Sequence, residues 1–153
     1  MRFLVIRNPT AGWQRQSVFR GYVAALERAG AEIVEQTTSG PGDATRIAAE
    51  AEPDLAGVIA AGGDGTINEV VNGLLANDTP PPLGALPLGT ANVYAAEVKL
   101  PFGQDEIAAC LTAGKTRTLR VGTVSPLGEG TERHFVLMAG AGFDAQVVAK
   151  VDP

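Results

Sequence analysis

The sequence has few cysteines and few aromatic residues. Cys110 is the single cysteine among 153 residues, so an internal disulfide is excluded. We expect Cys110 to be packed within a helix and kept reduced in the cytosol. Aromatic side chains make up 5% of the chain, whereas glycine occurs 19 times. Small residues in that number favour tight turns between strands and helices over a β-sandwich built on aromatic packing.

Basic runs and long apolar runs are missing as well. The formal net charge of −5 argues against nucleic-acid binding, which requires clustered lysine and arginine. No run of about 18 apolar residues is present, so a membrane span is not expected. The segment Met1 to Arg7 is too short and too interrupted by charge for a signal peptide. We therefore expect a cytoplasmic protein that binds no nucleic acid.

Hydrophobic residues account for 45% of the chain, which is enough to bury a core. Apolar runs alternate along the sequence with stretches of helical periodicity. Strands are predicted at 3–7, 32–37, 56–61 and 83–87, and helices at 16–29, from 43 onward, and at 67–75, 91–97 and 104–113. This alternation predicts an α/β fold with a doubly wound, mostly parallel sheet flanked by helices. The third strand is apolar throughout, which is typical of a strand covered on both faces.

The pattern changes in the last part of the chain. Strands are predicted at 117–124 and 133–139 with a loop at 125–130 between them, which indicates a hairpin. We assign residues 1–115 to the α/β domain and residues 116–153 to the beginning of a truncated β-rich domain. The exposed edge of an uncovered hairpin favours pairing between chains, so a homo-oligomer is one expectation.

A glycine-rich segment, Gly62 to Glu69, lies between the third strand and the next helix. Open α/β sheets place their ligands at this end of a strand. The glycines allow positive φ angles and a close approach of the backbone to an anion, and the helix start offers free N–H groups to phosphate. The carboxylate of Asp64 would repel phosphate by itself. Its presence here therefore predicts a Mg²⁺ ion between the two groups, bound directly or through water. Because neither GxxxxGK[ST] nor GxGxxG is present, we expect no dedicated lysine.

A purely structural interpretation of this segment stays open. Thr66 and Glu69 have the spacing of a capping box, in which case they would simply begin the helix. The glycines would then be turn residues that contact no ligand.

Polar clusters follow the other three predicted strands of the sheet. They occupy 8–12, 37–40 and 88–92 and are rich in small polar residues and glycine. Taken singly, each cluster is typical of a helix cap or a turn. Because the carboxyl ends of parallel strands meet at one edge of a sheet, we expect these clusters and the glycine-rich segment to line a single cleft.

Three segments together form a more specific pattern. They are Asn8-Pro9-x-x-Gly12, Gly62-Gly63-Asp64-Gly65-Thr66-x-Asn68-Glu69 and Pro87-Leu88-Gly89-Thr90-Ala91-Asn92. In order and spacing they resemble the catalytic domain of diacylglycerol kinases over residues 1–115, and the segment 140–145 resembles a further block of that family. Sphingosine kinases, ceramide kinases and bacterial lipid kinases share this domain, and NAD kinases are distant relatives.

The resemblance implies an ATP- and Mg²⁺-dependent kinase that phosphorylates a lipid hydroxyl, of diacylglycerol or a related lipid, at the inner face of a membrane. It places the nucleotide along the rim of the sheet, against Asn8, Thr38, Gly62, Gly63, Asp64, Gly65, Thr66, Ile67, Asn68 and Thr90. Asp64 would help to organise Mg²⁺ through water. The family's general base belongs to a later β-rich domain, so we expect it beyond Pro153 and expect this chain alone to be inactive.

Two alternatives stay open. An NAD kinase shares the Gly-Gly-Asp-Gly loop, although the continuation from Asn68 to Gly73 and the segment Gly89 to Asn92 favour lipid kinases. The chain is alternatively a non-catalytic module that binds nucleotide. There is one local departure from the family pattern, because Asn92 is followed by Val93 and Tyr94 where many members carry an acidic and then an aromatic residue.

Overall fold

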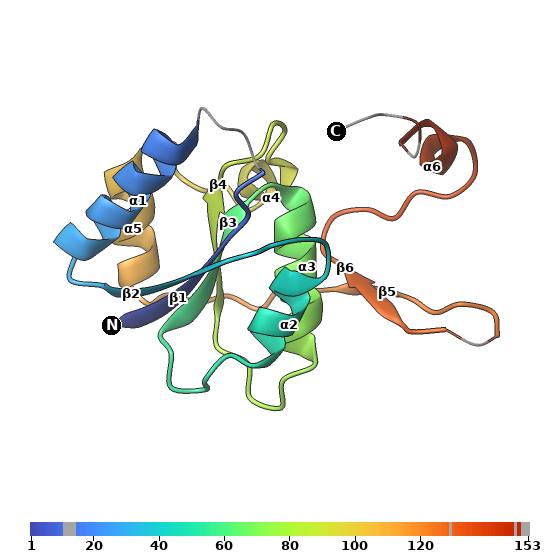
Figure 1. The fold of residues 1–153 in the computed structure, drawn as a ribbon, viewed down its shortest axis with the longest axis horizontal. Helices are drawn as coiled ribbons and strands as arrows, with labels where there is room; N and C mark the ends of the chain where they lie inside the picture. The colour runs from blue at the N-terminus through green and yellow to red at the C-terminus, as the bar shows by residue number, and fades with distance from the viewer. Residues whose placement is uncertain (11–14, 129, 149, 151–153) are drawn as a thin grey trace.

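A four-stranded parallel sheet forms the centre of the molecule (Figure 1). The computed structural model describes residues 1–10, 15–128, 130–148 and 150. The sheet has the order β2-β1-β3-β4 and consists of β1 (Arg2–Arg7), β2 (Glu32–Thr37), β3 (Gly57–Gly62) and β4 (Leu83–Pro87). The helices around it are α1 (Gln16–Arg28), α2 (Asp43–Ala49), α3 (Asp64–Leu75), α4 (Val93–Glu97) and α5 (Gln104–Thr112). The predicted α/β fold is confirmed.

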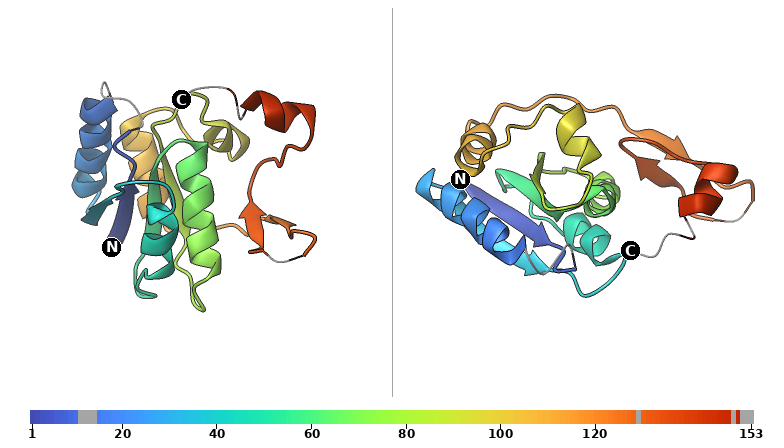
Figure 2. Two further views of the ribbon diagram at one scale, coloured as in Figure 1. Left: turned by 45° about the vertical axis from the view of Figure 1, so that its right-hand side comes forward. Right: turned by 90° about the horizontal axis from the view of Figure 1, so that it is seen from above.

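Helices cover both faces of the sheet, which gives three layers (Figure 2). Successive side chains of a strand point to opposite faces, so Leu4 and Ile6 pack toward α2 and α3. Their neighbours Phe3 and Val5 pack toward α1 and α5. All six residues of β3 are buried, as its continuous apolar sequence predicts.

The strand order creates a crevice at one edge of the sheet. From β1 the chain passes through α1 to β2 on one side, and then crosses back to β3 on the other side of β1. The connections that leave β1 and β3 therefore run in opposite directions. Ligands of open α/β sheets bind in the crevice that this reversal leaves at the carboxyl ends of the strands.

Helix α3 starts at this edge and packs closely against α2. Its buried stripe includes Ile67, Val70 and Leu74, at the spacing of one helical face. A Cβ atom on Gly73 would lie 2.2 Å from the carbonyl oxygen of Thr45 in α2, so only glycine allows this approach. The tight packing fixes the position of α3, and with it the loop that precedes the helix.

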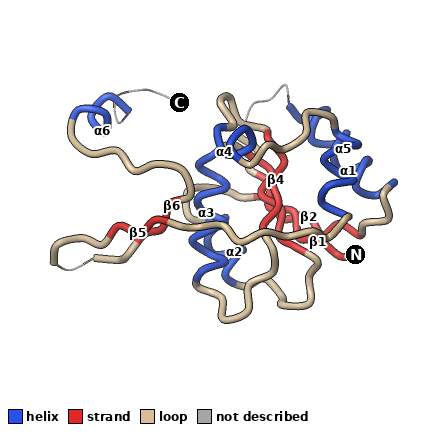
Figure 3. The backbone as a smooth tube through the Cα atoms, turned by 180° about the vertical axis from the view of Figure 1, so that it is seen from behind, coloured by secondary structure: helices blue, strands red, loops and turns tan. Residues whose placement is uncertain are grey.

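A short hairpin lies beside α3, away from the sheet (Figure 3). It pairs β5 (Gly122–Val124) with β6 (Arg133–Phe135) in antiparallel fashion, and α6 (Phe143–Val148) follows. The predicted hairpin is confirmed, but its strands are shorter than the predicted 117–124 and 133–139. The flanking apolar residues do not extend the ladder because they pack against the core on the α3 side of the sheet; they are Leu119, Val121, Val136 and Leu137. Helix α6 was not predicted from the sequence.

The structure tests the predictions made for Cys110 and for membrane-spanning helices. Cys110 lies on α5 as expected, but it is exposed, because the buried face of this helix is formed by Ile107 and Ala108. The prediction that Cys110 is packed was therefore wrong. Of the helices in the described part of the chain, none has the length and apolar character needed to cross a membrane.

Candidate functional site

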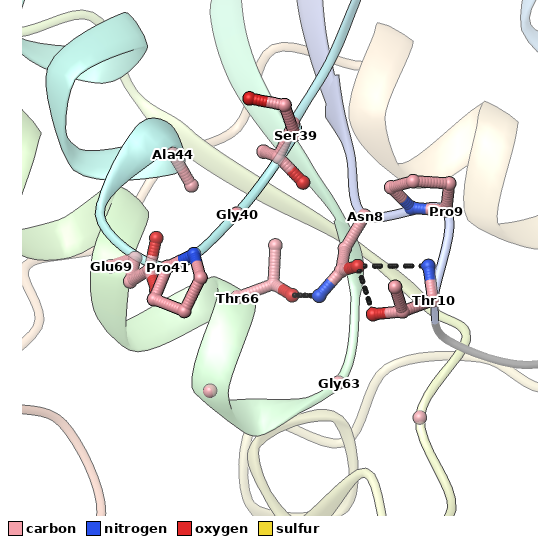
Figure 4. A pocket seen from close by; sticks show the side chains of 13 residues that line it. Asn8, Pro9, Thr10, Ser39, Gly40, Pro41, Ala44, Gly63, Thr66 and Glu69 are labelled. Atoms are coloured by element: carbon pink, nitrogen blue, oxygen red, sulfur yellow. Dashed lines mark hydrogen bonds between the residues drawn. The ribbon is translucent and has the colours of Figure 1, made fainter.

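A cleft of about 550 Å³ opens where the strands of the sheet end (Figure 4). This volume lies within the range of about 300–1,000 Å³ that is usual for small-molecule sites. The described residues that line it come from the ends of β1, β2, β3 and β4, from the first turn of α2 and from the first two turns of α3. They are Asn8, Pro9, Thr10, Thr38, Ser39, Gly40, Pro41, Ala44, Gly63, Gly65, Thr66, Glu69 and Gly89. The predicted convergence of four polar clusters on one cleft is thus observed; Gly12 of the first cluster lies outside the described residues.

Asn8 ties the end of β1 to the first turn of α3. Its side-chain nitrogen Nδ2 donates a hydrogen bond to Oγ1 of Thr66 at 3.2 Å. Its Oδ1 accepts bonds from the backbone N–H and the hydroxyl of Thr10, at 3.0 and 2.7 Å. Figure 4 shows the three side chains together on the floor of the cleft. Asn8 thereby fixes the spacing between two of the loops that form the site.

Two glycines, Gly63 and Gly89, meet at one wall of the cleft. A Cβ atom on Gly89 would lie 2.5 Å from Cα of Gly63, which is too close for any side chain. A Cβ atom on Gly62 would lie 2.4 Å from Oγ1 of Thr66. Positive φ angles are not the reason for these glycines, because none of Gly62, Gly63 and Gly65 has one. That expectation was wrong, and close packing of backbones replaces it.

The start of α3 is free of side-chain caps within the described part of the chain. The helix begins at Asp64 with Gly63 as its N-cap residue. Thr66 therefore lies inside the first turn, and the carboxylate of Glu69 accepts the N–H of Gly42 at 3.1 Å. The capping-box interpretation is wrong, because the helix starts two residues before Thr66. The first N–H groups of a helix have no partner within it, so this turn can present them to an anion.

Asp64 stands at the start of α3, but its carboxylate points toward α4. Oδ2 accepts the N–H of Val93 at 3.0 Å and Oδ1 accepts the N–H of Tyr94 at 2.9 Å. Asp64 is absent from the residues that line the cleft. The structure thus gives this side chain contacts that the sequence did not predict.

On the opposite wall, Thr38 and Ser39 follow β2. Thr38 is buried, and its N–H donates to the carbonyl oxygen of Arg7 at 2.9 Å. The N–H and the hydroxyl of Ser39 both donate to the carboxylate of Asp43 at the start of α2. These hydrogen bonds from Ser39 lower the pKa of Asp43 below its usual value. The wall is therefore built from backbone and hydroxyl groups.

Half of the predicted nucleotide-binding residues line the cleft. These are Asn8, Thr38, Gly63, Gly65 and Thr66; Gly62, Asp64, Ile67, Asn68 and Thr90 do not line it. Ile67 belongs to the core and its N–H is bonded to the carbonyl oxygen of Gly63. Gly62 is buried, and Thr90 is exposed beyond the wall that Gly89 forms. The binding roles of all ten residues remain predictions.

Pro41 and Ala44 line the cleft but were not predicted as site residues. Pro41 directly follows the cluster at 37–40, and this position was the signal that could have identified it. Ser39, Gly40 and Glu69 lie in segments that were predicted to line the cleft, but no binding role was assigned to them.

The described residues of the cleft include one ionisable side chain, Glu69, and neither lysine nor arginine. Arg15 lies nearby, but its guanidinium donates to the carbonyl oxygen of Gly89. In the described part of the chain, no three His, Cys, Asp or Glu side chains cluster in a way that could hold a metal. The cleft can therefore bind an anion through backbone N–H groups and hydroxyls, and a Mg²⁺ ion there would have to be held mainly by the anion itself.

Comparison with known proteins gives one consistent family. The family model described as diacylglycerol kinase catalytic domain matches residues 2–124. A diacylglycerol kinase of Bacillus subtilis is 40% identical over 148 residues, which cover 92% of this chain and 46% of the relative. One from Staphylococcus epidermidis is 36% identical over 150 residues, covering 95% of this chain and 45% of the relative.

A solved structure agrees with the sequence matches. The crystal structure of a diacylglycerol kinase from Bacillus anthracis superposes with a TM-score of 0.63 and 28% identity, over 78% of this chain and 42% of the other. The chain thus spans less than half of the length of these relatives. Since the family model alone matches more than half of the chain, this protein belongs to the diacylglycerol kinase catalytic domain family.

Proposed function

We propose that this chain binds ATP in the cleft and serves as the nucleotide-holding part of a lipid kinase. The observation that carries the proposal is the uncapped first turn of α3, which starts at Asp64 after the N-cap residue Gly63 and borders a cleft walled by glycine backbone. Backbone N–H groups and the positive end of a helix dipole bind phosphate without a basic side chain. Membership of a kinase family supplies the reason to choose ATP among phosphate ligands.

The residues of the cleft suit the tasks of nucleotide binding. The N–H groups at the start of α3 would hold phosphate oxygens, and the open space around Gly65 lets a ligand approach the backbone there. The hydroxyl of Thr66 accepts a hydrogen bond from Asn8, so its own proton can be donated to a phosphate oxygen. The hydroxyls of Thr10 and Ser39 already donate to Asn8 and Asp43, so they are left to accept from the sugar hydroxyls. Mg²⁺, when bound with ATP, would neutralise charge that develops during transfer of the γ-phosphoryl group.

We propose a lipid hydroxyl as the acceptor, of diacylglycerol or a related lipid, reached at a membrane surface. The relatives from Bacillus subtilis and Staphylococcus epidermidis are diacylglycerol kinases, which supports this choice. Among the described residues of the cleft the single carboxylate, that of Glu69, is bonded to the N–H of Gly42, so it is not placed as a free general base. We therefore expect the base to come from outside this chain, and expect the chain alone to bind ATP without phosphorylating lipid.

The test is titration of the chain with ATP in the presence of Mg²⁺, comparing wild type with Gly65→Val. Gly65 lines the cleft, and no atom lies within 4 Å of a Cβ added there, so the new side chain points into open space. It should leave the fold intact and obstruct the ligand, and we expect affinity to fall by about a hundredfold, or ~2.7 kcal/mol.

Ala109→Val is the matched control, because Ala109 is exposed on α5, outside the cleft. This variant should bind ATP like wild type. Equal ATP affinity in Gly65→Val and wild type would show that the nucleotide does not occupy this cleft. Lipid phosphorylation by the 153-residue chain would contradict the expected division between nucleotide binding and catalysis.

A further inference from the structure

The carboxylate of Asp64 connects two loops of the cleft. It belongs to the first turn of α3, yet both of its oxygens accept backbone N–H groups of α4, from Val93 at 3.0 Å and Tyr94 at 2.9 Å. A carboxylate that accepts two consecutive amides at the start of a helix acts as a cap for that helix. Asp64 therefore caps α4 from a different helix.

Helix α4 does not supply this cap itself. Its first turn has no acidic residue, and no side chain of its own caps it. Asn92 holds the N-cap position in a left-handed conformation, with φ 49°, and its side chain faces backward. Asn92 Oδ1 accepts the N–H of Gly89 and its Nδ2 donates to the carbonyl oxygen of Gly89, both at 2.8 Å. The amides of Val93 and Tyr94 are thus left for Asp64.

These contacts end at the wall of the cleft. Asn92 holds Gly89 by both its N–H and its carbonyl group, and Arg15 donates to the same carbonyl. Gly89 in turn lies against Gly63, with no room for a Cβ atom between them. Asp64 and Asn92 do not line the cleft themselves, but they fix the two backbones that do.

We propose that Asp64 is a positioning residue that clamps α4 and the Gly89 backbone against the glycine loop, and that it is not a ligand of Mg²⁺. The two N–H groups point the positive ends of their dipoles at the carboxylate. A cation on the same oxygens would lie close to those positive ends, which weaken its attraction to the carboxylate. The effect of Asp64 on nucleotide binding rests on the function proposed above, whereas the clamp itself does not.

The test separates a clamp from a metal ligand. We compare wild type, Asp64→Asn and Asp64→Ala for ATP affinity in Mg²⁺ and in EDTA, and for hydrogen exchange at the N–H groups of Val93 and Tyr94. For Asp64→Ala we expect faster exchange at both amides and about tenfold weaker ATP binding in both conditions. Asp64→Asn keeps one acceptor oxygen, so it should fall between Asp64→Ala and wild type.

Asp78→Asn is the matched control, since Asp78 is exposed and outside the cleft; it should behave like wild type. If Asp64→Ala does not fold, Asp64→Asn and Asn92→Gly take its place. Glycine at position 92 suits the left-handed backbone, so Asn92→Gly removes only the two hydrogen bonds between Asn92 and Gly89. ATP affinity should then fall equally with and without Mg²⁺.

Loss of affinity in Mg²⁺ alone, with unchanged exchange at both amides, would make Asp64 a metal ligand and overturn the proposal. Unchanged affinity and exchange in every variant would overturn it as well. Failure of wild type to bind ATP would refute the proposed function, while the exchange measurement would still decide whether the clamp exists.

Discussion

The sheet and the hairpin of this chain differ in how far their side chains are buried. In the sheet, β3 pairs with a strand on each side and has helices over both faces, so all its residues are buried. In the hairpin, β5 and β6 pair over three residues each, and large apolar side chains stay exposed around them, including Val124, Leu127 and Met138. The α/β part is therefore held by more buried side chains than the hairpin, which contacts α3 through β6.

That contact is narrow and specific. Asn72 of α3 donates from Nδ2 to the carbonyl oxygen of His134 and accepts the N–H of His134 at Oδ1, both at 2.9 Å. The side-chain amide of Asn72 thus bonds to both backbone groups of His134 in β6, as the backbone of a neighbouring strand would. Regions with few buried contacts open locally at a smaller free energy than the core. We therefore expect the two regions to differ in local stability.

The largest effect should come from the centre of the sheet. Ile59 is fully buried in β3, so Ile59→Ala should lower the free energy of unfolding by about 2–5 kcal/mol through lost burial and the cavity that remains. Urea denaturation followed by circular dichroism measures this change. Val124→Ala in β5 is the matched control; Val124 is 49% exposed, so the change should stay within about 0.5 kcal/mol. An equal loss of unfolding free energy in the two variants would contradict the proposed difference between the sheet and the hairpin.

An intermediate effect should appear where the two regions meet. Asn72→Ala removes both bonds to His134 and should weaken hairpin docking by about 1–3 kcal/mol. Hydrogen exchange should become faster in β5 and β6, while the amides of β3 keep their protection. His134→Ala keeps the backbone groups that Asn72 uses, so it should change exchange much less. Faster exchange throughout the sheet in Asn72→Ala would show that the hairpin and the sheet open as one unit.

Sequence patterns predicted the sheet far better than the contacts within the site. Strands β1, β3 and β4 were recognisable because burial on both faces requires continuous apolar runs, as in 57–62. The polar clusters were placed on one rim because parallel strands share a direction. The bonds that Asp64 accepts from Val93 and Tyr94 had no such signal, since they join residues about thirty positions apart and depend on how α3 and α4 pack.

The same limit explains the wrong assignment of the capping box. Thr66 and Glu69 have the correct spacing, but spacing does not determine where a helix begins. Helix α3 starts at Asp64 with Gly63 in the N-cap position, and the carboxylate of Glu69 accepts the N–H of Gly42 in the loop before α2. Local propensity was overruled by tertiary packing at the site itself.

The smallest effect is expected at two hydrogen bonds between a serine and a carboxylate, one in the α/β part and one in the hairpin. In the α/β part, Ser39 donates to Asp43; in the hairpin, the hydroxyl of Ser125 donates to Glu132 at 2.9 Å. The bonds from Ser39 lower the pKa of Asp43 in the folded state, so their stabilisation is present above the unfolded pKa of about 4. It is lost as the pH falls through the lower folded value.

Ser39→Ala should therefore lower the midpoint of thermal unfolding slightly at pH 7, and the gap to wild type should close below about pH 4. Ser125→Ala should leave this midpoint unchanged at both pH values, because the hairpin can open without unfolding the sheet. A gap for Ser39→Ala that persists at the lowest pH at which wild type stays folded would mean that Ser39 acts through packing against the cleft. A midpoint shift in Ser125→Ala as large as that in Ser39→Ala would place the hairpin in the same cooperative unit as the sheet.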